Sequence, residues 1–222
     1  MAIKVITVGE KILGKNEDKA KENKKLLDKH GILTVNIMSS PGAGKTSLIL
    51  STIKQMSKKW RLAVIEGDVA SSVDAEKVNA AGIPVVQINT AGGCHLDAFM
   101  VADALENLPL EKTDLMFIEN VGNLICPNNY LLGEDIRLMI ASMPEGDDKP
   151  IKYPAMFADS DVVIINKVDL QPYIDFNEKA FRKVVTGLNP DVIIFPVSCK
   201  TGMGLEAWFT WLDKSLKAKK NK

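Results

Sequence analysis

The sequence predicts an α/β fold, a mostly parallel sheet with helices on both faces. Short apolar runs rich in Val, Ile and Leu recur along the chain, and amphipathic segments of helical length separate them. Strands that are buried on both faces of a parallel sheet have such unbroken apolar runs. The intervening helices would supply the right-handed crossovers between parallel strands. The alternation therefore indicates a doubly wound sheet built from repeated β–α–β units.

The expected elements follow from this alternation in chain order. Residues 15–30 are rich in Lys and Glu with few apolar anchors, which predicts an exposed helix ended by Gly31. We therefore separate a charged helical extension, residues 1–31, from a domain of residues 32–222. The expected strands are residues 32–38, 62–68, 84–88, 114–120, 161–166 and 191–197. The expected helices are residues 46–58, 73–81, 96–105, 178–188 and 204–216.

Two segments stand apart from the alternation. Residues 137–153 read RLMIASMPEGDDKPIKY and predict a strand followed by a charged loop that prolines bound. The basic C-terminal sequence LKAKKNK predicts a frayed, solvated helix end rather than a binding patch.

Composition and charge exclude several classes of protein. The 222 residues contain 28 Lys plus Arg and 28 Asp plus Glu, and this balance argues against a nucleic-acid binder. Hydrophobic residues make up 46%, enough to bury a core, but no apolar run reaches the roughly 20 residues that cross a bilayer. No secretory signal is visible, and three cysteines are too few for a disulfide scaffold. We expect a cytoplasmic protein without membrane or nucleic-acid partners.

A phosphate-binding loop follows the first expected strand. Residues 39–47 read SSPGAGKTS and match the pattern G-x-x-x-x-G-K-[ST], with Ser39 in place of the first glycine. In such loops the backbone N–H groups surround the β-phosphate at a helix N-terminus. Lys45 would meet the β- and γ-phosphates, and the Thr46 hydroxyl would bind Mg²⁺. The expected phosphate contacts come from Pro41, Gly42, Ala43, Gly44, Lys45, Thr46 and Ser47.

A second motif selects the base. The strand DVVIIN runs into the sequence NKVD at residues 166–169, the N-K-x-D pattern of guanine-binding GTPases. The Asp169 carboxylate can accept both N1–H and the exocyclic N2–H of guanine, a donor pair that adenine lacks. Lys167 would lie along the base, and Asn166 would brace the loop. A short loop after the next strand would back the guanine and comprises Ser198, Cys199 and Lys200. We therefore expect GTP and GDP as ligands.

Carboxylates at two further strand ends are candidates for hydrolysis. One strand ends in EGD at residues 66–68, with Asp74 following, and the other ends at Glu119. Ras-type GTPases place an aspartate and a glycine in a D-x-x-G motif, and here Glu119 and Gly122 hold those places. The Gly122 amide would sense the γ-phosphate. The expected catalytic residues are Lys45, Asp68, Asp74 and Glu119, and the expected Mg²⁺ ligands are Thr46, Asp68, Asp74 and Glu119. No water-orienting glutamine or arginine finger is evident, which predicts slow intrinsic turnover or activation by a partner copy.

Cysteine and histidine residues form a third group of candidate site residues. Cys94 and His95 follow the expected strand PVVQI, and Cys126 lies shortly after Glu119. Thiolate and imidazole are donors that Ni²⁺ and Zn²⁺ favour. Cys94 and His95 are sequence neighbours, so they would share one metal only in a loop, or would otherwise serve two metals. Three donors fall short of a closed four-coordinate site, and a symmetric dimer would supply six. Buried packing of the cysteines is the alternative interpretation.

The motifs together resemble one family closely. SSPGAGKTS, EGDVASSVDAEK, GGCHLDA, FIENVGNLICP, EGDDKPIKYP and NKVDL are similar to segments of the HypB family, GTPases that assist nickel insertion into [NiFe]-hydrogenase. The resemblance runs from about residue 32 to the C-terminus. It implies a P-loop NTPase G domain of the signal-recognition/MinD-like class, with dimerisation governed by the nucleotide. It further implies that Cys94, His95 and Cys126 form a metal site at the dimer interface, and that residues 119–126 are the switch II segment.

The resemblance also implies partner proteins, and this chain differs from some family members in its N-terminal segment. Nickel-delivery proteins and the precursor of the hydrogenase large subunit are the implied partners. Some family members carry an N-terminal cysteine motif or a histidine-rich run, but here no cysteine precedes Cys94 and His30 stands alone. Any metal handling would then go through the G domain. Lys149 or Lys152, in the segment EGDDKPIKYP, would reach the partner's nucleotide or lie on a solvated surface loop.

Three other functions remain open on the sequence. A urease-accessory GTPase is a close relative, but its Cys-Pro-His metal motif is absent here. A nucleotide-regulated scaffold without a metal role would use Cys94 and Cys126 as packing residues. A P-loop kinase is disfavoured because NKVD selects guanine and no lid for an acceptor substrate is visible.

Overall fold

A seven-stranded parallel sheet forms the centre of the molecule, and the computed structural model describes residues 8–221. The strands are β1 (Leu33–Ser39), β2 (Leu62–Asp68), β3 (Val85–Asn89), β4 (Leu115–Glu119), β5 (Ile136–Ser142), β6 (Val162–Asn166) and β7 (Ile193–Pro196). They lie in the order β3-β2-β4-β1-β5-β6-β7, and every neighbouring pair is parallel. The predicted doubly wound sheet is confirmed.

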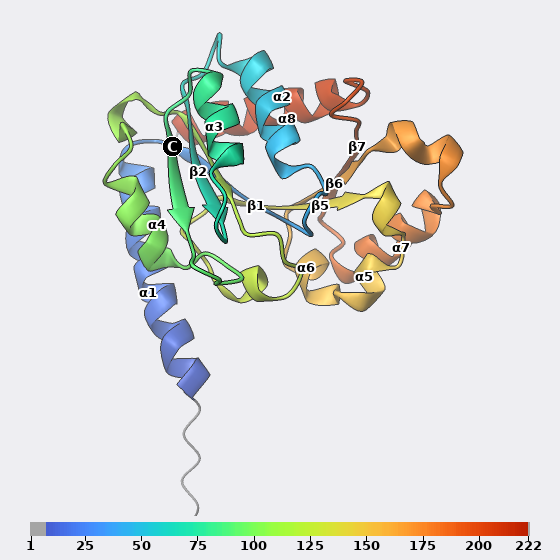
Figure 1. Cartoon of the computed structure of the whole chain (residues 1–222), viewed down its shortest axis with the longest axis horizontal. Coiled ribbons are helices and arrows are strands. Elements are labelled where there is room, and N and C mark those ends of the chain that lie inside the picture. The colour runs from blue at the N-terminus through green and yellow to red at the C-terminus, as the bar shows by residue number, and fades with distance from the viewer. Residues whose placement is uncertain (1–7, 222) are drawn as a thin grey trace, which may run out of the picture.

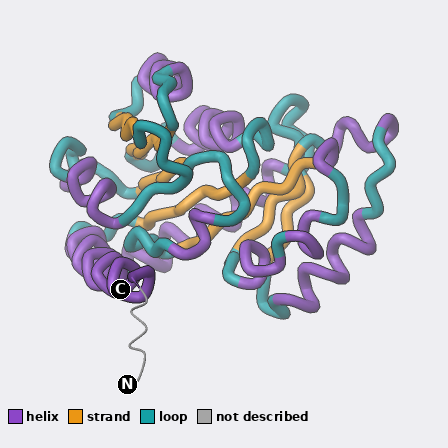
Figure 2. The backbone as a smooth tube through the Cα atoms, turned by 60° about the horizontal axis from the view of Figure 1, so that its bottom comes forward, coloured by secondary structure: helices purple, strands orange, loops and turns teal. Residues whose placement is uncertain are grey.

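Helices cover both faces of this sheet. They are α1 (Val8–Lys29), α2 (Lys45–Met56), α3 (Val73–Ala80), α4 (Ala98–Leu105), α5 (Lys149–Lys152), α6 (Pro154–Ala158), α7 (Glu178–Leu188) and α8 (Leu205–Lys220). Short 3₁₀ segments are Leu110–Lys112, Cys126–Asn129, Met143–Glu145 and Val168–Tyr173. In Figure 1, α2, α3 and α8 lie on one side of the strands, and α1, α4, α6 and α7 lie on the other. Figure 2 shows the strands enclosed between these layers.

The core on each face follows from the alternation of side chains along the strands. Val35 and Ile37 of β1 pack with Trp208 of α8 on one face. Met38, the next residue, packs on the opposite face in the cluster that contains Phe157 of α6. Because both faces are apolar, a central strand needs an unbroken apolar run, and this is the sequence signal that predicted it.

The carboxyl ends of the parallel strands meet at one edge of the sheet. In the strand register, Glu119 of β4 lies beside Ile37 of β1 on one side and beside Glu66 of β2 on the other. Ligand sites of open α/β sheets form at this edge, in the loops that follow the strands. The loops after β1, β2, β4 and β6 carry most of the predicted nucleotide and metal residues.

Helix α1 differs from the prediction of an exposed helix. It begins at Val8, and one of its faces is buried, including Asn16, Asn23 and Leu27. The two asparagines are polar in sequence but make buried contacts, so the apolar pattern alone did not show this face. The division of the chain at residue 31 stays a prediction.

The two segments that stood apart from the alternation agree with expectation only in part. The strand predicted within residues 137–153 is β5, a regular parallel strand between β1 and β6. The expected charged loop after it is partly helical, with a 3₁₀ segment and the short helix α5. Helix α8 continues to Lys220 instead of fraying, because Lys219 and Lys220 form ion pairs with Asp135 and Asp114. No helix in the described part of the chain is long and apolar enough to cross a membrane.

Candidate nucleotide and metal sites

The phosphate loop lies between β1 and α2, as predicted. Gly42 and Gly44 have φ angles of 76° and 110°, a region that strains other residues. Gly44 also has no room for a side chain, because a Cβ there would lie 2.3 Å from Asn166 Nδ2. Lys45 is the first residue of α2, so the loop and the helix N-terminus present backbone N–H groups to the same space. The arrangement suits the phosphates of a nucleotide.

A cavity of about 240 Å³ lies beside this loop and is formed largely by the predicted base-binding residues. Its lining comprises Gly42, Gly44, Ser47, Asn166, Lys167, Asp169, Leu170, Ser198, Cys199 and Lys200. The structure therefore brings together the NKVD segment, the loop at residues 198–200 and the phosphate loop. Burial raises the pKa of the Cys199 thiol to about 11, so this cysteine is neutral at physiological pH.

Hydrogen bonds fix the shape of this cavity. Asn166 Nδ2 donates to the Ala43 carbonyl at 2.8 Å, and Asn166 Oδ1 accepts from the Cys199 amide at 3.2 Å. Lys167 Nζ donates to the Gly42 carbonyl at 2.7 Å. The Ser198 hydroxyl donates to Asp169 Oδ1 at 2.6 Å, so the carboxylate that would read guanine is held in place. Asn166 braces the loop as the sequence predicted.

An acidic cluster lies on the other side of the phosphate loop. Carboxylate oxygens of Glu66, Asp74 and Glu119 lie within 4.8 Å of one another. The Thr46 hydroxyl donates to Glu119 Oε1 at 3.0 Å, and Lys45 Nζ lies 3.9 Å from the same oxygen. Four of the predicted hydrolysis residues, Lys45, Thr46, Asp74 and Glu119, therefore meet at one point.

Asp68, the remaining predicted residue, lies outside this cluster. Its Oδ1 accepts hydrogen bonds from the backbone amides of Ala70 and Ser71 at 2.9 and 2.7 Å, and these bonds lower its pKa. Glu66, two residues earlier, stands in the cluster instead and was not among the predicted ligands. The strand register explains the difference, because Glu66 is the residue of β2 that lies beside Glu119.

The acidic cluster fits a hard divalent cation. Burial, followed by the negative charge of Glu119, raises the pKa of Glu66 to about 10, and burial also raises the pKa of Glu119. Glu66 Oε2 and Glu119 Oε2 are buried without a hydrogen-bond partner among the described residues. Carboxylate oxygens without a hydrogen-bond partner, beside a hydroxyl, are suitable Mg²⁺ ligands. Gly122 approaches the phosphate loop closely, since a Cβ there would lie 3.0 Å from Pro41 Cα.

A second cluster contains softer donors. Donor atoms of Cys94, His95 and Cys126 lie within 4.8 Å of one another. Cys94 and His95 lie in the loop between β3 and α4, the arrangement that the sequence required if both were to share a metal. Cys94 Sγ is 3.6 Å from His95 Nδ1. The His95 ring stacks on Tyr130, with ring centroids 3.8 Å apart, and burial lowers its pKa. A neutral imidazole and two nearby thiols suit Ni²⁺ or Zn²⁺.

Asn120 connects the two clusters through hydrogen bonds. It follows Glu119 directly, and its Oδ1 accepts from the Leu96 amide at 3.1 Å and from the Val121 amide at 2.9 Å. Leu96 follows His95 in the sequence. Asn120 is buried, and its Nδ2 donates to Asn36 of β1 at 3.3 Å. Neither this role nor the Tyr130 stack has a signal in the sequence, because both depend on contacts between distant segments.

Comparisons with known proteins identify the family. A family model described as the CobW/HypB/UreG nucleotide-binding domain matches residues 33–196. The chain is 45% identical to hydrogenase maturation factor HypB of Rhizobium leguminosarum bv. viciae, over 96% of this chain and 71% of that protein. It is 40% identical to a probable hydrogenase maturation factor HypB of Methanocaldococcus jannaschii, over 96% of both chains.

Solved structures with a similar fold include two groups. HypB from Helicobacter pylori in complex with nickel superposes with a TM-score of 0.88 at 38% identity, over 92% of this chain and 96% of that one. The signal recognition particle receptor FtsY from Elizabethkingia anophelis, in complex with GDP, gives a TM-score of 0.52 at 14% identity, over 75% of this chain and 57% of that one. The second likeness shows only the shared fold. The phosphate loop, the NKVD segment and both donor clusters thus belong to a member of the HypB family of hydrogenase maturation factors.

Proposed function

We propose that this protein is a GTP-hydrolysing nickel metallochaperone. It would bind Ni²⁺ as cargo at the soft-donor cluster, Cys94, His95 and Cys126, and change its affinity for the ion with the state of the nucleotide. The observation that carries the proposal is the path of residues 119–126. This segment begins in the acidic cluster at Glu119 and ends in the soft-donor cluster at Cys126. A change at one cluster therefore has a short covalent route to the other.

Guanine selectivity rests on the cavity beside the phosphate loop. Ser198 holds the Asp169 carboxylate, which would accept the two guanine N–H groups. An adenine would leave that carboxylate without donors, at a cost of about 1–3 kcal/mol. Lys167, on the rim of the cavity, would cover the base.

Thr46, Glu66, Asp74 and Glu119 would hold Mg²⁺ beside the phosphates, directly or through water. The ion would neutralise charge on the β- and γ-phosphates. Lys45, between the acidic cluster and the phosphate loop, would stabilise charge that develops on the γ-phosphate. A water-orienting glutamine and an arginine finger are not evident in the sequence, so we propose slow turnover. A second copy, through Lys149 or Lys152, would be a further source of activation.

The soft-donor cluster would hold nickel incompletely in one chain. It offers three donors, all half-exposed, whereas closed sites use four or more. Two copies joined around a two-fold axis would supply six donors, so we propose a homodimer that forms with the nucleotide. The relative from Helicobacter pylori was solved in complex with nickel. We further propose that delivery proteins and the precursor of the hydrogenase large subunit are partners, and that the site acts in the reducing cytoplasm, where its thiols stay free.

A nickel titration of the nucleotide-free, GDP-bound and GTP-analogue-bound protein tests the proposal. Thiolate-to-metal absorbance reports binding, and light scattering reports dimerisation. We expect a thiolate band whose affinity changes with the nucleotide, and we expect Cys94→Ala to remove it. In the nucleotide-free state Cys199→Ser is the matched control, because it also removes one thiol but lies in the base cavity, away from the soft-donor cluster. The absence of a thiolate band in every state would leave a GTPase or scaffold whose cysteines only pack.

A further inference from the structure

Helix α1 contacts the rest of the molecule through two buried asparagines. Asn16 and Asn23 on this helix are only 2% and 3% exposed. Asn16 Oδ1 accepts from the Ala98 amide at 2.8 Å, while its Nδ2 donates to the Leu131 carbonyl at 2.8 Å. Asn23 Nδ2 donates to the Ala98 carbonyl at 2.8 Å and to the Leu132 carbonyl at 3.0 Å. Each asparagine therefore bridges the same two segments.

These two segments carry the soft-donor cluster. Ala98 begins α4 and ends the loop that contains Cys94 and His95. Leu131 and Leu132 follow the segment that contains Cys126 and Tyr130, the residue stacked on His95. Neither segment belongs to a strand at these points, so the sheet does not fix their separation.

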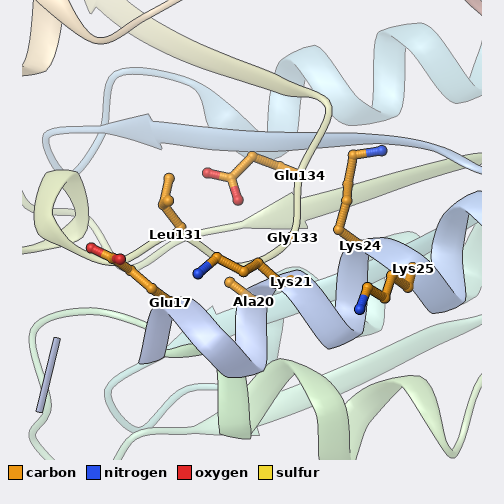
Figure 3. Close-up of a pocket in the computed structure, with 8 residues that line it drawn as sticks. All are labelled: Glu17, Ala20, Lys21, Lys24, Lys25, Leu131, Gly133 and Glu134. Atoms are coloured by element: carbon orange, nitrogen blue, oxygen red, sulfur yellow. The ribbon is translucent and has the colours of Figure 1, made fainter. Parts of the chain in front are cut away.

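The packing of α1 against the second segment is close. Gly133 has φ of 103°, and a Cβ there would lie 2.8 Å from the Ala20 carbonyl oxygen and 2.9 Å from the Lys24 amide nitrogen. Figure 3 shows Leu131, Gly133 and Glu134 lying over the face of α1 that carries Ala20 and Lys24. Lys24 also forms an ion pair with Asp135 at 2.9 Å. Helix α1 is thus seated on this segment through its backbone as well as its asparagines.

We propose that Asn16 and Asn23 are positioning residues for the soft-donor cluster: through them, α1 holds the loop of Cys94 and His95 and the segment of Cys126 at a fixed separation. The proposal rests on the proposed function for its ligand, Ni²⁺, but not for its geometry. An amide suits this task because it can donate and accept at once, whereas an apolar side chain would leave buried backbone groups unpaired. Residues behind metal ligands typically change metal affinity by about 10–100-fold when removed.

A set of variants separates positioning from general stability. Asn16→Ala removes both bonds of Asn16. Asn16→Asp keeps an acceptor for the Ala98 amide but places a carboxylate oxygen against the Leu131 carbonyl, so it repels the segment of Cys126 alone. Asp28→Asn is the matched control, because Asp28 also anchors α1, through Lys219 of α8, without contacting either segment. All variants are made with Cys199→Ser, which leaves two thiols.

Two measurements are made on each nucleotide-free variant, together with its melting temperature. The first is Ni²⁺ affinity from the thiolate-to-metal absorbance. The second is the rate at which dibromobimane, a reagent that fluoresces when it joins two nearby thiols, links Cys94 to Cys126 without metal. We expect Asn16→Ala and Asn23→Ala to weaken Ni²⁺ binding about tenfold and to slow the linkage, and Asn16→Asp to slow it at least as much as Asn16→Ala. Asp28→Asn should leave both readouts unchanged even where its melting temperature falls.

The outcomes distinguish this inference from the function on which it rests. Unchanged linkage rates in folded Asn16→Ala and Asn23→Ala would overturn the positioning role, whatever the metal does. Equal losses in Asp28→Asn would also overturn it, because they would show a general effect of loosening α1. If the parent bound no Ni²⁺ while the asparagine variants slowed the linkage, the positioning role would stand and the nickel function would fail.

Discussion

The nucleotide region and the metal region of this molecule are built in different ways. In the nucleotide region, strand ends hold the side chains directly, and Asn166, Lys167 and Asp169 each have a hydrogen-bond partner in the cavity. In the metal region, Cys94 and His95 lie in a loop, and their main contacts are with each other and with Tyr130. The first region is therefore held by its own hydrogen bonds, while the second depends on supports at a distance.

The difference suits the two proposed tasks. A preformed cavity binds its ligand without a further cost of ordering, which favours tight and selective nucleotide binding. A cargo site must also release its ion, and donors on loops can separate when a neighbouring segment moves. Asn120 and the asparagines of α1 are the contacts through which such movement would reach the loops.

Lys45→Ala should cause the largest loss of activity, and it should affect the nucleotide region but not the metal region. The ammonium group lies beside the phosphate loop and near Glu119, so its removal takes away positive charge where the γ-phosphate would react. We expect GTP hydrolysis to fall by at least about a hundredfold, with nucleotide-free Ni²⁺ binding retained. Phosphate release measures the effect, and Lys54→Ala, an exposed lysine on the same helix, is the control. Turnover equal to the parent would place the phosphate site elsewhere.

Asp169→Asn should have the next largest effect and tests the base cavity. The amide can no longer accept both guanine N–H groups, so GTP affinity should fall about 10–100-fold while xanthosine triphosphate gains. Competition between the two nucleotides gives the ratio directly. Asp175→Asn, on an exposed position nearby, should keep the parent's preference. Full guanine preference in Asp169→Asn would contradict the assignment of this carboxylate.

Asn120→Ala tests whether the two regions are coupled, because it removes a hydrogen-bond contact between them. The variant loses the bond to the Leu96 amide and the bond to Asn36. In the parent, we expect the Ni²⁺ affinity to differ between the GTP-analogue-bound and GDP-bound states. In Asn120→Ala, the ratio of these two affinities should be about three- to tenfold closer to one. Asn120→Asp keeps the acceptor for Leu96 and should retain most of the ratio. An unchanged ratio in the alanine variant would show that coupling takes another route.

The nucleotide region could be predicted from sequence because its motifs are local. A strand, a glycine-rich turn and a helix follow one another within SSPGAGKTS, and the backbone does most of the binding. The NKVD segment is likewise a single strand end. Its hydrogen bond to the phosphate loop, between Asn166 and Ala43, agrees with the bracing role predicted for Asn166.

Two features of the sites could not be predicted, because they depend on register and packing. Asp68 and Glu66 are equally plausible Mg²⁺ ligands in sequence, and only the pairing of β2 with β4 places Glu66 beside Glu119. Asn16 looks like one more polar residue in a solvated helix, yet it bonds to Leu131, which is 115 residues away. Hydrophobic patterning carries no signal for a buried asparagine.

Asp114→Asn should have the smallest effect and leaves both regions untouched. Asp114 lies at the opposite end of β4 from Glu119, where Arg61 and Lys220 pair with its carboxylate. Hydrogen bonds from Arg61 hold the pKa of Asp114 well below its ordinary value of 3.8. Since the folded pKa is lowered, this carboxylate stabilises the fold above about pH 4, and the contribution is lost as the pH falls toward the folded pKa.

We therefore expect Asp114→Asn to lower the free energy of unfolding by about 1 kcal/mol at pH 7, a modest value because the Arg61 side chain is 56% exposed. The difference from the parent should shrink below pH 4, where the unfolded parent is itself protonated. Urea unfolding at several pH values measures it, with Asp103→Asn as an exposed control. Nucleotide and Ni²⁺ affinities should stay at the parent's values. A loss of either affinity would mean that the amino-terminal edge of the sheet is coupled to the ligand sites. Stability at that edge and ligand binding at the opposite edge would then not be independent.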